Sequence, residues 1–244
     1  MVTSPSSASM SPSKKKRIDL LDGWRTVAVL TMVVWHVLWD MTAMFGMLPS
    51  DFMRRDNVQL TRYFIVFSFL LLSGISCHFS RSNIRRGWQT AGCAAVITLV
   101  TYLIGDPAKF GILHLFAACM LLYGWLGKWF AKIPDLWAGG LSLGVFCVLW
   151  IWLDTFRVGF DWLFPLGFRS IYFYSSDYYP VLPWFFLFLF GTVLGRRIAV
   201  DDGRWKEIVL PRAITWPGRH ALLIYMLHQP LIVAVLTLVQ KAAA

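Results

Sequence analysis

The stretch that decides the fold is Arg17–Asp40, RIDLLDGWRTVAVLTMVVWHVLWD, a long apolar run that carries ionisable residues at regular spacing. Side chains four residues apart lie on one face of an α-helix, and eleven residues at 100° each return to within about 20° of the starting direction. One polar stripe therefore contains four residues: Asp22, Arg25, His36 and Asp40. An ionisable side chain at bilayer depth costs roughly 2.5–3.5 kcal/mol to insert, so such residues normally face a protein interior or a wet cavity. The stretch predicts a transmembrane helix that lines a functional site.

The composition is that of a multi-pass membrane protein. Of the 244 residues, 57% are hydrophobic and only 15% are charged, which excludes a soluble domain. Each crossing of a bilayer core of about 30 Å needs about 20 apolar residues. Stretches of this kind cover residues 17–40, 60–79, 87–104, 110–126, 136–153, 181–194 and 221–239. We expect an all-α fold of about seven transmembrane helices that forms a single domain, residues 17–241.

Two segments lie outside these spans. Residues 1–16 are Ser-rich and end in a basic run, and their low apolar content predicts a disordered tail. The span that follows lacks a small-residue cleavage pattern, so we expect it to stay uncleaved. The loop 154–180 is rich in Phe, Tyr and Trp. This pattern favours an interfacial aromatic belt, with a lid or a carbohydrate-stacking surface as the alternative.

The formal net charge of +10 is distributed unevenly. Sixteen of the 23 Lys and Arg residues fall on the side of the N-terminus if the spans alternate. Cytoplasmic loops of membrane proteins collect Lys and Arg, so the bias predicts a cytoplasmic N-terminus and an external loop 154–180. We find no nucleic-acid motif and no metal-binding motif, and we expect neither kind of ligand.

Inside the spans, His36 and Asp40 are the first candidates for chemistry. A carboxylate within hydrogen-bond reach would raise the basicity of the imidazole and select which ring nitrogen is free, which makes the pair a candidate general base. The alternative is an interhelical polar contact that only sets helix packing.

Further polar residues occur in other spans. His114 lies in FGILH, and His228 is followed by Gln229 and Pro230. If these groups converge on His36 they form one intramembrane polar cluster; otherwise each is a satisfied interior residue. At the membrane entry of the first span, Arg25 binds a phosphate or carboxylate of a cytosolic ligand, or it pairs with Asp22.

These pieces together resemble the catalytic-domain family of heparan-alpha-glucosaminide N-acetyltransferase, including its short bacterial members, and the wider transmembrane acyltransferase group that contains the acyltransferase-three proteins. The matching pieces are RIDLLDGWR (17–25), WHVLWD (35–40), FSFLLLSGIS (67–76), TLVTYLIGDPAKFGILHL (98–115), YYPVLPWFFLFLFGTVLGR (178–196) and GRHALLIYMLHQPLI (218–232).

The resemblance assigns roles by position. Asp22 and Arg25 match the D-x-x-R at the start of the first helix, His36 matches the acyltransferase-three histidine, and Asp40 completes the bacterial H-x-x-x-D. The remaining matches are Ser73, Gly74 and Ser76 at the end of the second span, His114 in FGILH, Pro183 and Trp184 in LPW, and His228, Gln229 and Pro230 in HQP.

The function that the resemblance implies is transfer of an acetyl group from cytosolic acetyl-CoA to an amine or hydroxyl of a sugar on the external side. It implies catalysis by His36 and Asp40 and donor binding by Asp22 and Arg25. The implied substrate-binding residues are His114, Trp184, His228 and Gln229. The expected location is a bacterial cytoplasmic membrane, and a second copy of the chain would close the cavity in a homodimer.

Two other classes of protein remain as alternatives. A sugar or anion transporter would use the polar stripe as a pathway. A haem-binding electron carrier would use His36, His114 or His228 as axial ligands.

Overall fold

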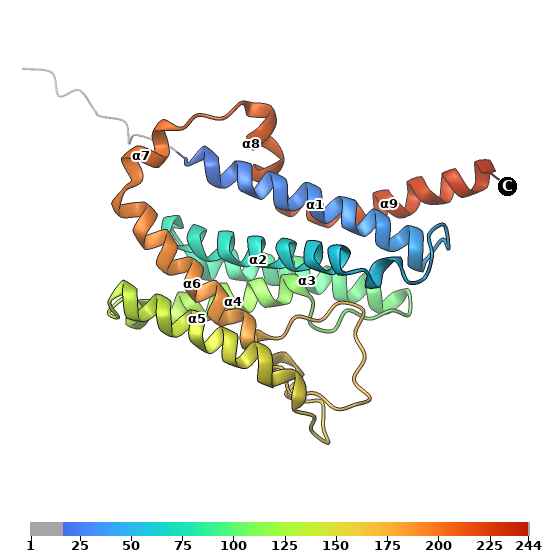
Figure 1. Cartoon of the computed structure of the whole chain (residues 1–244), viewed down its shortest axis with the longest axis horizontal. Coiled ribbons are helices and arrows are strands. Elements are labelled where there is room, and N and C mark those ends of the chain that lie inside the picture. Colours follow the sequence, from blue (N-terminus) through green and yellow to red (C-terminus); the bar gives the residue numbers. More distant parts are fainter. Residues whose placement is uncertain (1–16, 244) are drawn as a thin grey trace, which may run out of the picture.

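The computed structural model describes residues 17–243, so the predicted tail, residues 1–16, lies outside the described part of the chain. The described residues form an all-α bundle (Figure 1). Its helices are α1 (Asp19–Ala43), α2 (Asp56–Phe79), α3 (Asn83–Leu103), α4 (Ile112–Phe130), α5 (Asp135–Trp152), α6 (Val181–Val200), α7 (Asp202–Glu207), α8 (Arg212–Arg219) and α9 (Ala221–Ala243). Three short 3₁₀ turns, at Phe52–Arg54, Leu153–Thr155 and Phe164–Leu166, lie in the connections.

Local sequence explains where several helices begin. Prolines 134, 180 and 211 directly precede α5, α6 and α8, where a residue with a fixed φ and no backbone N–H is tolerated. Ser82 caps α3 by accepting a hydrogen bond from the backbone N–H of Arg85 at 3.2 Å.

The expected multi-pass helical fold is confirmed. Six helices, α1, α2, α4, α5, α6 and α9, are long and apolar enough to cross a membrane. The remaining expected span, residues 87–104, corresponds to α3, which is 21 residues long but more polar because it begins with Asn83, Arg85 and Arg86. Figure 1 shows these seven long helices running in alternating directions, α3 included. The chain is an integral membrane protein.

The alternation gives the bundle two ends. We call the end where α1 starts, with residues 80–82 and 131–134 and helices α7 and α8, the basic end. The opposite end carries the connections 44–55, 104–111 and 153–180, and we call it the loop end. Which end faces the cytoplasm stays a prediction from the charge bias.

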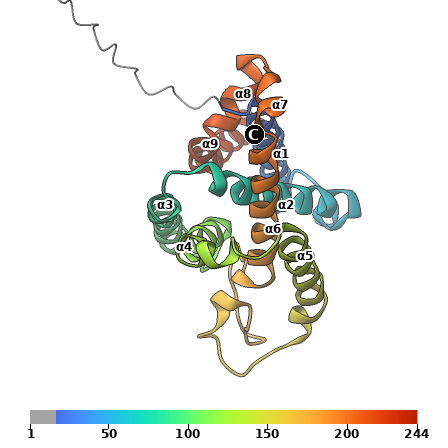
Figure 2. The ribbon, with the colours of Figure 1, turned by 90° about the vertical axis from the view of Figure 1, so that its left-hand side faces the viewer.

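Helices α2 and α6 form the centre of the bundle (Figure 2). Helix α5 packs on α6, α4 contacts both α2 and α6, and α3 covers α4. On the other side α1 lies against α2, and both α8 and α9 lie against α1. The first and the last long helices of the chain are therefore neighbours.

The central crossing of α2 and α6 depends on glycines. A Cβ atom at Gly191 would lie 2.6 Å from the carbonyl oxygen of Leu71, and one at Gly195 would lie 2.7 Å from that of Ile75. A Cβ at Gly74 would overlap the carbonyl oxygen of Phe188. Small residues at membrane helix interfaces allow backbones to approach this closely.

Gly74→Ala tests this packing. The added methyl group has no space against the α6 backbone, so we expect the free energy of unfolding to fall by about 1–3 kcal/mol. Thermal unfolding in detergent measures the effect. Gly92→Ala is the matched control, since a Cβ at that position meets nothing within 4 Å, and equal melting temperatures of the two variants would contradict the packing argument.

Candidate functional site

Two histidines meet inside the membrane-spanning part of the bundle. The ring of His36 on α1 lies against that of His228 on α9, with centroids 4.6 Å apart and planes at 78°. Nδ1 of His36 lies 2.9 Å from the carbonyl oxygen of Met32, and Nδ1 of His228 lies 2.6 Å from that of Tyr225. Because a carbonyl only accepts hydrogen bonds, both Nδ1 atoms carry the proton. In the neutral form of each ring, Nε2 is then the acceptor.

Asp40 lies one turn beyond His36 but has a different partner. Its carboxylate is 1% exposed and accepts hydrogen bonds from Nε2 of Gln229 at 2.9 and 2.8 Å. The expectation that Asp40 orients His36 by a direct hydrogen bond therefore needs correction. The carbonyl of Met32 orients His36, and Asp40 instead ties α1 to the HQP element of α9.

Three buried polar atoms around this pair have no hydrogen-bond partner among the described residues. They are Nε2 of His228, Oε1 of Gln229 and Nε1 of Trp35, whose ring contacts His36 edge-on at 5.1 Å. Buried polar groups in native proteins are almost always paired, and unpaired ones call for a specific explanation. Two acceptors and one donor remain available here for a ligand with its own polar hydrogens.

A network of charges surrounds the start of α1 at the basic end. Asp22 is 3% exposed; its Oδ1 lies 2.6 Å from Nη1 of Arg25, and its Oδ2 lies 3.0 Å from Nε of Arg219. Nη2 of Arg25 also donates to the hydroxyl of Ser76, and Arg219 reaches Asp19 at 2.8 Å. The predicted pairing of Asp22 with Arg25 is thus present.

The pairing does not cancel the positive charge at this place. Arg17 and Arg86 also act electrostatically on Arg25, and Nη1 of Arg86 donates to the carbonyl oxygen of Ser76 at 3.4 Å. Arg25 and Arg219 thus pair with the carboxylates of Asp19 and Asp22, and Arg17 and Arg86 add two further positive charges near Arg25. The formal excess of two positive charges suits a phosphate-bearing ligand.

Two predicted substrate contacts do not join the histidine pair. His114 on α4 has Nε2 3.1 Å from the hydroxyl of Thr98 on α3. Trp184 is 5% exposed and lies in an aromatic cluster, edge-on to Trp150 at 4.9 Å and to Phe67 at 5.7 Å. The structure thus unites four of the predicted residues, His36, Asp40, His228 and Gln229, and places His114 and Trp184 elsewhere.

Sequence reasoning missed the buried carboxylate of Asp177 at the loop end. Its Oδ2 accepts a hydrogen bond from the backbone N–H of Ile112 at 3.0 Å. Burial raises the pKa of Asp177 to about 6, and the nearby charge of Arg62 opposes that shift. Asp177 lies in the irregular stretch SSDYYP, where no periodic pattern marks a buried position.

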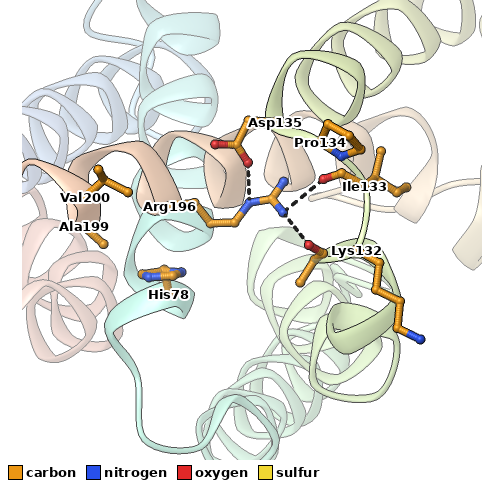
Figure 3. A pocket seen from close by; sticks show the side chains of 9 residues that line it. His78, Lys132, Ile133, Pro134, Asp135, Arg196, Ala199 and Val200 are labelled. Carbon is orange, nitrogen blue, oxygen red and sulfur yellow. Dashed lines mark hydrogen bonds and ion pairs between the residues drawn. The ribbon is translucent and has the colours of Figure 1, made fainter.

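A cavity of about 480 Å³ opens at the basic end, away from the histidine pair (Figure 3). Arg196 crosses it, 3.1 Å from Asp135, and donates to the carbonyl oxygens of Ala131 and Ile133. Figure 3 shows that this guanidinium bonds to Asp135 and to the α4–α5 connection, which indicates a structural role.

The contact between His36 and His228 argues against haem binding between these two residues. His36 and His228 are in edge contact, which leaves no space for a porphyrin plane between them, and His114 lies on another helix pair. Among residues 17–243 no group of three or more His, Cys, Asp or Glu side chains is placed to hold a metal ion. The histidine pair instead fits proton transfer to or from a bound hydroxyl or amine.

Comparison with known families identifies this arrangement. The family described as "Heparan-alpha-glucosaminide N-acetyltransferase, catalytic" matches residues 17–230, which is most of the chain and includes α1, the histidine pair and the HQP element. No curated protein and no solved structure gives a match. The resemblance read from the sequence motifs is therefore confirmed.

The burial of Asp177 predicts a pH effect on stability. Its pKa is about 6 in the folded protein, against an ordinary value of 3.8, so the folded state holds the proton more tightly. This group contributes stability below about pH 4, and the contribution is lost as the pH rises through about 6.

Melting temperatures of the wild type and Asp177→Asn in detergent check this sign. We expect the variant to be the more stable of the two at pH 7, and the difference to shrink as the pH falls. Parallel pH profiles of the two proteins would contradict it.

Proposed function

The chain belongs to the heparan-alpha-glucosaminide N-acetyltransferase catalytic family and is a transmembrane acetyltransferase; we propose that it carries an acetyl group from acetyl-CoA, bound at the basic end, to an amine or hydroxyl of a sugar that enters from the loop end. The observation that carries this proposal is the contact between the imidazoles of His36 and His228, each with Nδ1 bonded to a backbone carbonyl and Nε2 left as the acceptor when the ring is neutral.

In the direct route, His36 acts as general base. Nε2 of His36 takes the proton of the acceptor O–H or N–H while the acceptor atom forms a bond to the acetyl carbonyl carbon. The C–S bond then breaks, and the thiolate leaves with CoA. In the two-step route, Nε2 of His36 attacks the acetyl carbonyl carbon and CoA leaves as the thiolate. The sugar O or N atom then bonds to that carbon, the bond to Nε2 breaks, and the freed imidazole takes the sugar's proton. Both routes use the same nitrogen.

Asp40 acts through Gln229 in this proposal. It is a positioning residue, because its carboxylate holds the Gln229 amide and leaves Oε1 directed away from that bond. Oε1 of Gln229 and Nε2 of His228 then accept hydrogen bonds from other polar hydrogens of the sugar. Their lack of protein partners supports this role.

The donor is held at the basic end. Arg25 and His36 are eleven residues apart on α1, which is about 16 Å along the axis and nearly the same helix face. An elongated donor whose phosphates lie near Arg25 and Arg86 would place its thioester toward mid-membrane. With the N-terminus in the cytoplasm of a bacterial cell, this end faces the acetyl-CoA pool, and the charge bias supports that orientation.

His36→Ala tests the catalytic role. We expect acetyl transfer to fall by about 10²–10⁴-fold, the usual contribution of general acid–base catalysis. The assay incubates purified protein with radiolabelled acetyl-CoA and glucosamine and measures label on the sugar. His220→Ala is the matched control, because His220 is an exposed histidine outside the pair.

Full transfer by a folded His36→Ala variant would overturn the mechanism. Movement of sugar across proteoliposomes without consumption of acetyl-CoA would favour the transporter alternative.

Arg86→Gln tests the donor site without removing a member of the Asp22 network. Loss of one positive charge near Arg25 should raise KM for acetyl-CoA about tenfold, which corresponds to about 1.4 kcal/mol, and leave kcat and the KM for the sugar unchanged. Arg85→Gln is the control, because this neighbouring arginine is exposed. Steady-state kinetics with each substrate varied in turn measure the KM for acetyl-CoA and the KM for the sugar separately. Equal KM values for acetyl-CoA in Arg86→Gln and Arg85→Gln would refute this placement of the phosphates.

A further inference from the structure

The loop end carries a buried carboxylate that the proposed reaction does not yet use. Asp177 lies in the connection between α5 and α6 and approaches the start of α4 so closely that a Cβ atom at Gly111 would overlap its Oδ2. The neighbouring connections are joined by further bonds: the backbone N–H of Tyr179 donates to Phe110 at 2.9 Å, and that of Lys109 donates to the hydroxyl of Ser175 at 2.9 Å. Asp177 is thus held in a defined place.

Arg62 lies close enough for its charge to act on this carboxylate, but no ion pair among the described residues joins the two. Arg62 is in the second turn of α2. Nε of Arg62 is buried and has no hydrogen-bond partner. The guanidinium lies over the ring of Tyr63, 5.2 Å from its centroid. The Arg62 guanidinium and the Asp177 carboxylate therefore lie in the same region but do not bond to each other.

Two tyrosines connect this place to the histidine pair. Asp177 and Tyr179 both act electrostatically on Tyr225 of α9. The Tyr225 ring lies 5.4 Å from the ring of His228. The backbone carbonyl of Tyr225 accepts a hydrogen bond from Nδ1 of His228. Polar groups thus run from the loop end through Tyr225 to His228 and His36.

We propose that Asp177 and Arg62 form the subsite that binds the acceptor sugar, with the carboxylate accepting from one hydroxyl or amino group and the guanidinium donating to a neighbouring hydroxyl oxygen. Adjacent polar groups on one sugar ring bridge a separated carboxylate and guanidinium that do not meet directly. Tyr179, two residues along the chain from Asp177, packs edge-on to Trp184 at 5.8 Å and supplies an aromatic ring near this subsite. This subsite rests on the proposed function for the reaction, but binding at it is measurable without the reaction.

Asp177 also has a structural role, because it accepts the hydrogen bond from Ile112. Asp177→Asn separates the two roles. The asparagine keeps an acceptor oxygen for the Ile112 N–H but removes the charge that a sugar amine or hydroxyl would meet. Since the buried charge lowers stability at pH 7, this variant should be at least as stable as the wild type while binding sugar less well. A residue that only pinned the loop would show no loss of binding with the asparagine.

The experiment measures glucosamine binding and transfer in the full-length protein in detergent. Binding is read from the rise in melting temperature as glucosamine is added, and transfer from KM and kcat with each substrate varied. The variants are Asp177→Asn and Arg62→Gln. Asp161→Asn is the control, since Asp161 is an exposed aspartate in the same loop that accepts from the backbone N–H of Ser170.

We expect Asp177→Asn and Arg62→Gln to weaken glucosamine binding at least tenfold and to raise its KM by the same factor. The KM for acetyl-CoA should stay unchanged, and Asp161→Asn should behave as the wild type. Equal glucosamine binding by wild type and Asp177→Asn, or no binding by the wild type, would overturn the subsite. Binding that depends on Asp177 in a protein that transfers no acetyl group would support the subsite and refute the proposed reaction.

Discussion

Asp40 is a carboxylate buried among apolar helices, and the two hydrogen bonds from Gln229 satisfy it there. In a bilayer no water is available to solvate an isolated charge, so its partner must come from the protein. This interaction joins α1 to α9, the first and the last long helices of the chain, and sets their register. Because His36 lies one helical turn before Asp40 and His228 directly precedes Gln229, the same register brings the two imidazoles into contact. The candidate site therefore follows from how one carboxylate is satisfied.

A second connection between the two ends of the chain lies at the start of α1. Gly218 of α8 approaches α1 so closely that its backbone N–H donates to the hydroxyl of Thr26 at 2.8 Å, while Arg219 pairs with Asp22 and Asp19. Buried ion pairs give little net stability, but removal of one partner leaves an uncompensated charge and costs about 3–5 kcal/mol. The role of this network is thus to hold α8 over α1 and to keep the neighbouring arginines in place. The two connections fix α1 near its start and near its end.

Much of the fold and part of the site follow from the sequence alone. All seven expected spans are helices, because about 20 consecutive apolar residues have few other stable structures. The stripe of Asp22, Arg25, His36 and Asp40 was predicted from helix periodicity, which fixes the face of each residue. Periodicity does not fix the rotamer. Helical side chains lean toward the N-terminus, so His36 bonds the carbonyl of Met32 rather than Asp40.

Motif membership did not predict which way His114 and Trp184 face, and no local pattern links Arg62 to Asp177 across more than a hundred residues.

Three carboxylates of this protein are fully paired, whereas several other buried polar atoms have no partner among the described residues. Asp22, Asp40 and Asp135 are each buried or half-buried, and each has partners that account for both carboxylate oxygens. By contrast, Nε1 of Trp35, Nε2 of His228, Oε1 of Gln229 and Nε of Arg62 are buried and unpaired. A half-satisfied buried network is less stable than an apolar core, so a protein gains nothing in folding by keeping one. Trp35 and His228 contact the His36 ring and Gln229 bonds to Asp40, while Arg62 acts electrostatically on Asp177 at the loop end. A substrate that brings its own donors and acceptors would satisfy them in turn, and a hydroxyl-bearing sugar ring has that chemistry.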